Sequence, residues 1–268
     1  MTHFKGYKYQ KGLWVTRDKR YMMPRRGMMA ASASGASYSA VSVLFDGTND
    51  YLTSGADLSG AADGKRMIVS FWMNVKGGDD TERVFFQQAG NVTELKFTTA
   101  NKLQFDVNGA STRIVSTDTF VAAGGWVHVY FSMDVNAGGG NYFRLYTNDT
   151  EVSYDTQTKD DSNKDFTFSL PFGATAAGGS KIHCDIADVY INFAEDLDPA
   201  TTSNRRKFIT AGGKPVDLGA TGTGPTGSTP DVLLTNPVAT WHENEGDGGD
   251  PYFTENGALT AGTDSPSD

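Results

Sequence analysis

Apolar and polar residues alternate along most of the chain beyond residue 40. The longest alternating runs span residues 67–75, 127–135 and 187–193. Shorter runs follow the same rule at 41–45, 95–97, 103–107 and 143–145. A period of two is typical of strands that bury one face and turn the other toward solvent. The pattern therefore predicts an all-β protein.

Glycine-rich stretches separate these runs. The chain has 31 Gly and 9 Pro among its 268 residues, and residues 76–79 and 137–141 spell KGGD and AGGGN. Such stretches form tight connections between strands. Many one-sided strands joined in this way predict two antiparallel sheets packed face to face.

One helix is predicted near residues 199–210. Asp198 suits the N-cap, Pro199 suits the first helical position, and Gly212-Gly213 can end the helix. A Gly/Thr-rich connection follows at 219–230, and residues 232–234 return to strand character. We therefore expect one β-sandwich domain over 38–268, which includes this connection and the acidic C-terminal segment.

The charge is unevenly placed. Residues 1–27 hold eight Lys and Arg against one acid, Asp18, a net charge of +7, whereas the whole chain carries −9. Beyond Lys214 there are nine Asp and Glu and no Lys or Arg. A basic arm with an acidic tail is typical of a subunit that binds an acidic neighbour. Residues 1–37 are thus predicted to be an extended arm, with a solvated terminus as the alternative.

The arm interleaves its basic residues with aromatic ones. Its two methionine pairs, Met22-Met23 and Met28-Met29, suit a groove on another protein. We therefore favour a protein partner over nucleic acid. The predicted partner-binding residues are Lys5, Lys8, Lys11, Trp14, Arg17, Lys19, Arg20, Arg25 and Arg26.

The chain lacks the sequence signals of a membrane or disulfide-stapled secreted protein. No segment approaches the ~18 consecutive apolar residues of a membrane span. The basic N-terminus is not followed by an apolar stretch, so no signal peptide is predicted. The single cysteine, Cys184, excludes an intrachain disulfide. We expect synthesis and folding in a cytoplasm.

Several blocks of sequence carry a family resemblance. Residues 42–53 (SVLFDGTNDYLT), 124–152 and 186–198 resemble strands of laminin-G-like, concanavalin A-like jelly rolls. Residues 212–234 and 241–260 resemble the C-terminal part of such domains in particle proteins of tailed bacteriophages and prophages. The resemblance implies a jelly-roll fold and a place on a virion. Residues 1–37 match no pattern.

Catalytic constellations are missing from the sequence. The β-glucanases of this fold place closely spaced carboxylates on one strand, and no such spacing is present. The nearest candidates are Asp185 with Asp188, on opposite strand faces by parity, and a group at the end of a strand: Glu195, Asp196 and Asp198. Cys184 follows His183 directly, so their side chains point to opposite faces. We predict no enzymatic activity.

Calcium is the one cofactor that the resemblance raises. Laminin-G-like domains often bind it at the sandwich rim, and Asp46, Asn49 and Asp50 share one loop. Carboxylate and amide oxygens suit Ca²⁺. The alternative is that these residues only form a turn, which is their common role. We expect no cofactor, with a calcium site in this loop as the alternative.

Aromatic side chains fall on the strand faces opposite the apolar stripes. Four of them could form a face for a glycan or for a protein partner: Trp72, Trp126, Tyr130 and Tyr190. A neighbouring subunit could equally cover them.

These observations combine into one functional prediction. The chain is predicted to be a non-enzymatic structural protein of a tailed-phage virion, either a head decoration protein on the capsid or a tail-attached subunit. Its partners would be other virion proteins and copies of itself, held through the arm. The alternatives are a carbohydrate-binding adhesin that recognises host surface glycans and, third, a polysaccharide hydrolase.

Overall fold

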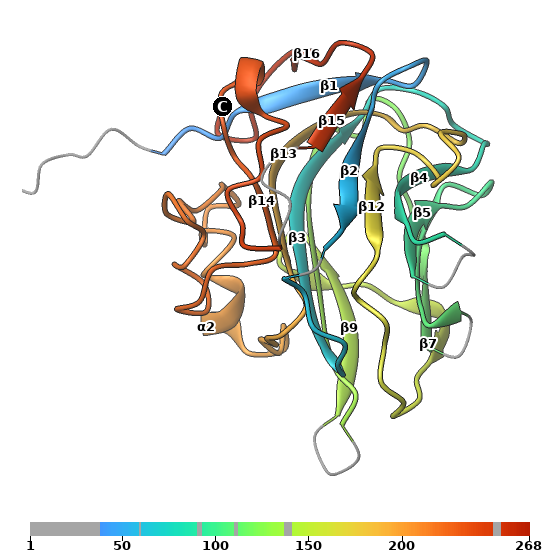
Figure 1. Cartoon of the computed structure of the whole chain (residues 1–268), viewed down its shortest axis with the longest axis vertical. Coiled ribbons are helices and arrows are strands. Elements are labelled where there is room, and N and C mark those ends of the chain that lie inside the picture. The colour runs from blue at the N-terminus through green and yellow to red at the C-terminus, as the bar shows by residue number, and fades with distance from the viewer. Residues whose placement is uncertain (1–37, 59, 90–92, 110–111, 137–140, 249–252) are drawn as a thin grey trace, which may run out of the picture. The chain divides into compact units, whose positions relative to one another are not determined.

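The protein is built from two antiparallel sheets of eight strands each, packed as a sandwich (Figure 1). The computed structural model describes residues 38–58, 60–89, 93–109, 112–136, 141–248 and 253–268. The predicted all-β jelly roll is confirmed. The predicted arm, residues 1–37, lies outside the described residues.

Sheet A holds the longest strands, and its order runs from β10 to β16, with β14 pairing alongside β13. Its strands are β10 (Thr150–Glu151), β9 (Tyr142–Thr147), β8 (Trp126–Asp134), β3 (Arg66–Val75), β13 (His183–Asn192), β1 (Ser42–Asp46), β16 (Thr260–Ala261) and β14 (Val232–Leu234).

Sheet B packs against one face of sheet A and has none of the strands of nine or ten residues. In order it contains β11 (Tyr154–Thr158), β7 (Thr112–Thr119), β6 (Lys102–Val107), β5 (Glu94–Phe97), β4 (Arg83–Gln87), β12 (Ser169–Phe172), β2 (Tyr51–Asp57) and β15 (Phe253–Asn256). The acidic C-terminal segment thus supplies an edge strand to each sheet, β15 to one and β16 to the other.

The apolar stripes meet between the sheets. Phe105 of β6 and Phe131 of β8 bring their ring centroids to 4.0 Å, and Phe71 lies 5.0 Å from Phe85. All four side chains are almost fully buried. Burial of each such ring contributes roughly 2–3 kcal/mol, so these contacts hold the two layers together.

Strand β13 departs from strict alternation. Its register shifts between Ala187 and Tyr190, and Asp188 takes a φ of 51°. This bulge lets Cys184 as well as Val189 join the core between the sheets. Parity predicted that Asp185 and Asp188 lie on opposite faces. That prediction is wrong, because the bulge turns both carboxylates toward the outer face.

The predicted helix is shorter than its signals suggest. Helix α2 spans Thr202–Arg205, and its N-cap residue is Thr201. Asp198 does not cap it, since its carboxylate accepts the Ala200 N–H instead. Val238–Thr240 form one 3-10 turn, η2. Within the described ranges, no helix has the length and apolar character needed to cross a bilayer.

Candidate functional site

The outer face of sheet A is covered by the chain itself. Phe208, which follows α2, packs on Tyr130 and Tyr190 at centroid distances of 4.8 and 5.3 Å. The Tyr130 hydroxyl also donates to the Leu197 carbonyl at 2.6 Å. Both tyrosines are no more than 1% exposed. The prediction that they lie on an exposed glycan or partner face is therefore wrong.

Of the two predicted tryptophans, Trp72 is buried and Trp126 is only partly buried. Trp72 is 3% exposed and lies 4.9 Å from the His128 ring. Trp126 donates its indole N–H to Asp264 of the C-terminal segment at 3.0 Å. Ser267 accepts the Ala40 N–H nearby. Alternation predicted their strand face correctly, but it could not show that Ala40 and Ile209 pack on Trp72 or that the C-terminal segment contacts Trp126.

The Asp46 loop forms a turn whose oxygens are largely occupied. Asp46 Oδ1 accepts the backbone N–H groups of Thr48, Asn49 and Asp50. Burial alone would raise the pKa of Asp46, but these hydrogen bonds, with His183 nearby, hold it below its ordinary value. Asp50 in turn accepts the Asp46 and Ala258 N–H groups.

In this loop the carboxylate oxygens of Asp46 and Asp50 already accept backbone N–H groups. Among the described residues, no group of three or more His, Cys, Asp or Glu could hold a metal ion. The residues predicted to bind calcium, Asp46, Asn49 and Asp50, are instead held as turn formers. The calcium site stays a prediction.

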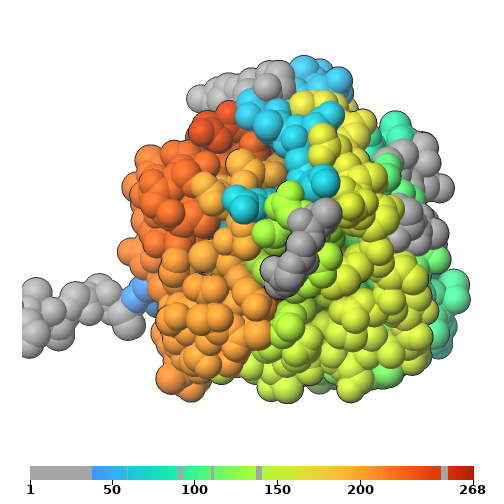
Figure 2. Space-filling model, turned by 90° about the horizontal axis from the view of Figure 1, so that it is seen from below, coloured from blue at the N-terminus to red at the C-terminus, as the bar shows by residue number. Residues whose placement is uncertain are grey.

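A groove opens at the end of the sandwich where β3 begins and β8 ends, the lower end in Figure 1. We call it the basal groove. Its volume is about 440 Å³. It is lined by Ala62, Asp63, Gly64, Lys65, Arg66, Asn136, Asn163, Phe193 and Ala194. Figure 2 looks onto this end, where the blue-cyan chain lies between the orange and the green segments.

Different parts of the chain bring these polar side chains together. Asp63 and Lys65 precede β3, Asn136 follows β8, and Asn163 belongs to the segment between β11 and β12. The bridge between Gly64 and Lys164 fixes that segment against the start of β3. The groove is therefore a product of the fold and has no contiguous motif.

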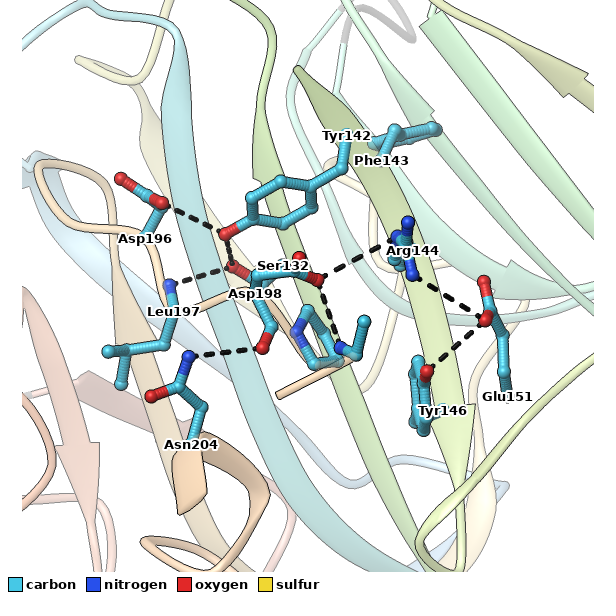
Figure 3. Close-up of polar contacts among 12 residues, drawn as sticks. Ser132, Tyr142, Phe143, Arg144, Tyr146, Glu151, Asp196, Leu197, Asp198 and Asn204 are labelled. Atoms are coloured by element: carbon cyan, nitrogen blue, oxygen red, sulfur yellow. Dashed lines mark hydrogen bonds and ion pairs between the residues drawn. The ribbon is translucent and has the colours of Figure 1, made fainter. Parts of the chain in front are cut away.

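Arg66 forms one wall of the groove through a network of ion pairs and hydrogen bonds. Its Nε lies 3.0 Å from Asp196 and 3.7 Å from Asp134. Asp196 also accepts the Tyr142 hydroxyl at 3.0 Å, and that hydroxyl lies 3.2 Å from Ser132 Oγ (Figure 3). Burial raises the pKa of Asp196, against the opposing effects of Tyr142 and Arg66.

A second charged cluster continues from this wall along β9. Arg144 lies 3.7 Å from both Glu151 and Asp198, and Tyr146 donates to Glu151 at 3.1 Å (Figure 3). Of the predicted group Glu195, Asp196 and Asp198, the last two thus belong to different networks, Asp196 with Arg66 and Asp198 with Arg144. In each network one arginine lies between two carboxylates, Arg66 between Asp134 and Asp196 and Arg144 between Glu151 and Asp198.

Strand pairing also creates a carboxylate pair that sequence reasoning missed. Glu94 of β5 lies directly opposite Asp106 of β6, on the outer face of sheet B. Glu94 is 2.7 Å from Lys96 Nζ, and Asp106 accepts two hydrogen bonds from Arg113. Each carboxylate is therefore matched by a cation of its own. Only the strand register reveals that Glu94 and Asp106 are cross-strand neighbours.

The basic arm residues predicted to bind a partner all lie outside the described residues. They are Lys5, Lys8, Lys11, Trp14, Arg17, Lys19, Arg20, Arg25 and Arg26. Their role stays a prediction.

Comparison with known proteins supports the same fold. Residues 46–194 match the family model described as the concanavalin A-like lectin/glucanases superfamily. A search of curated proteins gave no match. The native heptameric SAP-like pentraxin of Limulus polyphemus is 15% identical, with a TM-score of 0.53, over 84% of this chain and 95% of that one.

A second solved structure is similar over a comparable stretch. A putative carbohydrate binding protein from Bacteroides ovatus is 12% identical, with a TM-score of 0.58. The similarity covers 85% of this chain and 62% of that chain. At sequence identities of 15% and 12%, the two structures show similarity of fold alone.

Proposed function

The chain belongs to the concanavalin A-like lectin/glucanases superfamily, and from that premise we propose that it is a non-enzymatic domain that binds glycans in the basal groove. The observation that carries the proposal is the groove itself, about 440 Å³ lined by five polar side chains. That volume lies in the range of small-ligand sites. The carbohydrate-binding description of the Bacteroides ovatus protein agrees with this choice.

The chemistry of the lining suits a ligand rich in hydroxyl groups. Asn163 offers an amide donor and a carbonyl acceptor. Asn136 offers its carbonyl and a second amide N–H beside the one that it donates to Asp134, and the Asp63 carboxylate adds further acceptors. Adjacent polar atoms of this kind can bind neighbouring hydroxyls of one sugar ring. Lys65 and Arg66 supply further donors, and Asp134 and Asp196 offset the charge of Arg66. This balance favours a neutral sugar over an anionic one.

Recognition would depend on hydrogen bonds more than on ring stacking. Phe193 is the one aromatic residue of the lining and is only 1% exposed. Affinity per sugar unit should therefore be modest, in the range of Kd values from about micromolar to millimolar.

The absence of catalysis is part of the proposal. Glycosidases need one carboxylic acid and one carboxylate around the scissile bond. Asp134 and Asp196 are both engaged by Arg66, and Asp63 accepts the Phe166 N–H at 3.0 Å. These contacts support a binding role for the carboxylates.

A glycan array tests the proposal. The labelled full chain is applied to oligosaccharides that include maltose, cellobiose, lactose and sialyllactose, with calcium and with a chelator. We expect binding to at least one neutral sugar, lost in Asn136→Ala/Asn163→Ala and retained in Ser203→Ala, a change at an exposed position of α2. Absence of binding to every sugar under both conditions would overturn the proposal.

The role on a virion is a second candidate, which the basic arm favours. Eight Lys and Arg within residues 1–27 could anchor the domain to acidic neighbours, and the glycan would then belong to a host surface. Particles assembled with a chain that lacks residues 1–37 test this. Normal incorporation of the truncated chain would contradict anchoring by the arm.

A further inference from the structure

A second hollow lies at the end of the sandwich opposite the basal groove. We call it the rim hollow. Its volume is about 580 Å³. It is lined by Asp46, Gly47, Thr48, Gly78, Thr81, Glu82, Ser180, Lys181 and His183. It therefore includes the loop that the sequence singled out for calcium.

Two long strands fix the separation of the two sites. Strand β3 starts at Arg66 in the basal groove and ends three residues before Gly78 of the rim hollow. Strand β13 starts at His183 of the rim hollow and ends just before Phe193 of the basal groove. Ten strand residues span about 33 Å. The two hollows are thus roughly 30 Å apart and cannot share one small ligand.

Close backbone contacts hold the His183 ring in the rim hollow. A Cβ on Gly77 would lie 2.6 Å from His183 Nδ1, and one on Gly47 would lie 2.9 Å from the His183 Cβ. Gly47 also has a φ of 74°, which favours glycine. A side chain at either position would press on His183, so the two glycines let the backbone pack closely against it. His183 and Asp46 are also direct partners across β13 and β1.

The other polar groups of the rim hollow are also anchored. Lys181 Nζ donates to the Gly178 carbonyl at 2.5 Å and lies 5.5 Å from the Tyr51 ring. Thr81 Oγ1 donates to the Gly78 carbonyl at 2.6 Å. Glu82 is 3.1 Å from Lys96 and keeps 42% of its side chain exposed. The site is therefore largely formed before any ligand arrives.

These groups match a hydroxyl-rich ligand better than a metal ion. Asp46 stays ionised at neutral pH, because backbone hydrogen bonds hold its pKa below the ordinary value. Carboxylates of Asp46 and Glu82 accept hydrogen bonds, and His183 can accept or donate. No cluster of three metal-ligating side chains occurs among the described residues. Donors and acceptors in this mixture suit the hydroxyls of a saccharide.

We propose that the rim hollow is a second saccharide-binding site, so that one chain binds two sugar units at opposite ends and can cross-link glycans. This inference rests on the proposed function of the basal groove. Two sites on one rigid body raise the avidity for a multivalent surface without any new contact. One chain is thus bivalent because the basal groove and the rim hollow lie at opposite ends of the sandwich.

Isothermal titration and cross-linking together test the second site. The probes are soluble maltose, cellobiose and lactose, and the same sugars displayed on a polymer. Thr48→Trp blocks the rim hollow from an exposed position, Asn163→Trp blocks the basal groove, and Ser203→Trp on α2 is the matched control. His183→Ala with Glu82→Ala is a second rim variant that removes its polar groups.

We expect two saccharides per chain for the parent and the control, one for each blocked form, and none when both sites are blocked. Turbidity with the polymer should appear only where both sites are open. One saccharide per chain in the parent, unchanged by either rim variant, would overturn the second site and leave the basal groove intact. Absence of binding to all probes would instead refute the proposed function, and the second site with it.

Discussion

Tyr38 donates a hydrogen bond of 2.7 Å to Asp188, which lies 150 positions further along the chain. Asp188 sits in the bulge of β13 and is 3% exposed. Its other oxygen, Oδ2, has no hydrogen-bond partner among the described residues. The fold thus buries a carboxyl group in which only one of the two oxygens has a hydrogen bond among the described residues. Such a group lowers the stability of the folded protein when it is ionised.

Asp188→Asn should stabilise the protein above neutral pH. Burial raises the pKa of Asp188 to about 7 from the ordinary 3.8, with Asp217 adding to the rise and the Tyr38 hydrogen bond opposing it. The folded protein therefore keeps a proton that the unfolded chain loses, so the contribution of Asp188 to stability falls as the pH rises from about 4 to about 7. At pH 8, denaturant unfolding should show a gain of a few kcal/mol, at most roughly 4.

The same experiment contains its own controls. At pH 4 the variant and the parent should unfold with free energies that differ by less than about 1 kcal/mol, because Asp188 is then protonated in the folded protein and only partly ionised in the unfolded chain. The exposed Asp118→Asn should change little at either pH. Other buried groups leave a pH dependence in Asp188→Asn. Burial raises the pKa of Asp231 to about 6, which lowers stability as the pH rises, and lowers the pKa of His128 to about 3, which has the opposite effect. A difference between variant and parent that does not grow between pH 4 and pH 8 would contradict the prediction.

Arg83→Lys should be strongly destabilising although it keeps the charge. Arg83 is 1% exposed, and its two Nη atoms donate to the Gly77 carbonyl at 2.8 Å and to Asn101 Oδ1 at 2.7 Å. Its guanidinium lies 4.4 Å from the Phe97 ring. Lysine cannot reproduce this planar fork, so we expect a loss of about 2–4 kcal/mol in the free energy of unfolding.

Arg144→Lys is the comparison for this effect. Arg144 is one-third exposed, and both of its ion pairs are 3.7 Å long. Exposed pairs contribute less than about 1 kcal/mol. Equal losses for the two variants, measured by denaturant unfolding, would show that the buried fork of Arg83 has no special role.

Period-two alternation was sufficient to predict the sandwich, because burying one face of each strand is what the pattern encodes. It failed at Asp188, where one bulge reversed the parity of half a strand. It also failed for Tyr130 and Tyr190. Alternation predicts that they lie on the outer face of the sheet, but it does not show that Phe208 covers them. The basal groove could not be predicted, because Asp63, Asn136 and Asn163 meet only through tertiary packing.

Gly77→Ala should disturb the rim hollow, whereas Gly212→Ala should not. A Cβ at Gly77 would lie 2.6 Å from His183 Nδ1, but one at Gly212 would meet no atom closer than 3.8 Å. The first change forces the imidazole out of its position, at a cost of about 1–3 kcal/mol. Unfolding measurements give the cost, and the NMR resonances of His183 report the displacement. Equal stability of the two variants would contradict the close packing of Gly77 against His183.

Tyr142→Phe should weaken the wall of the basal groove. The Tyr142 hydroxyl lies 3.2 Å from Ser132 Oγ and donates a hydrogen bond of 3.0 Å to Asp196. The Asp196 carboxylate in turn lies 3.0 Å from Arg66 Nε. Without the hydroxyl, both partners lose a hydrogen bond in a mostly buried site. We expect a loss of about 1–2 kcal/mol in the free energy of unfolding. Tyr51→Phe, whose hydroxyl takes no part in this network, should lose less.

Saccharide binding separates a purely structural role of Tyr142 from one in positioning Arg66. If Asp196 orients the guanidinium toward the groove, Tyr142→Phe should raise the Kd for a neutral disaccharide several-fold at a temperature where the variant is fully folded. The rim hollow, roughly 30 Å away, should keep its affinity. An unchanged Kd at the basal groove, together with the expected loss of stability, would mean that the network supports the fold without orienting Arg66.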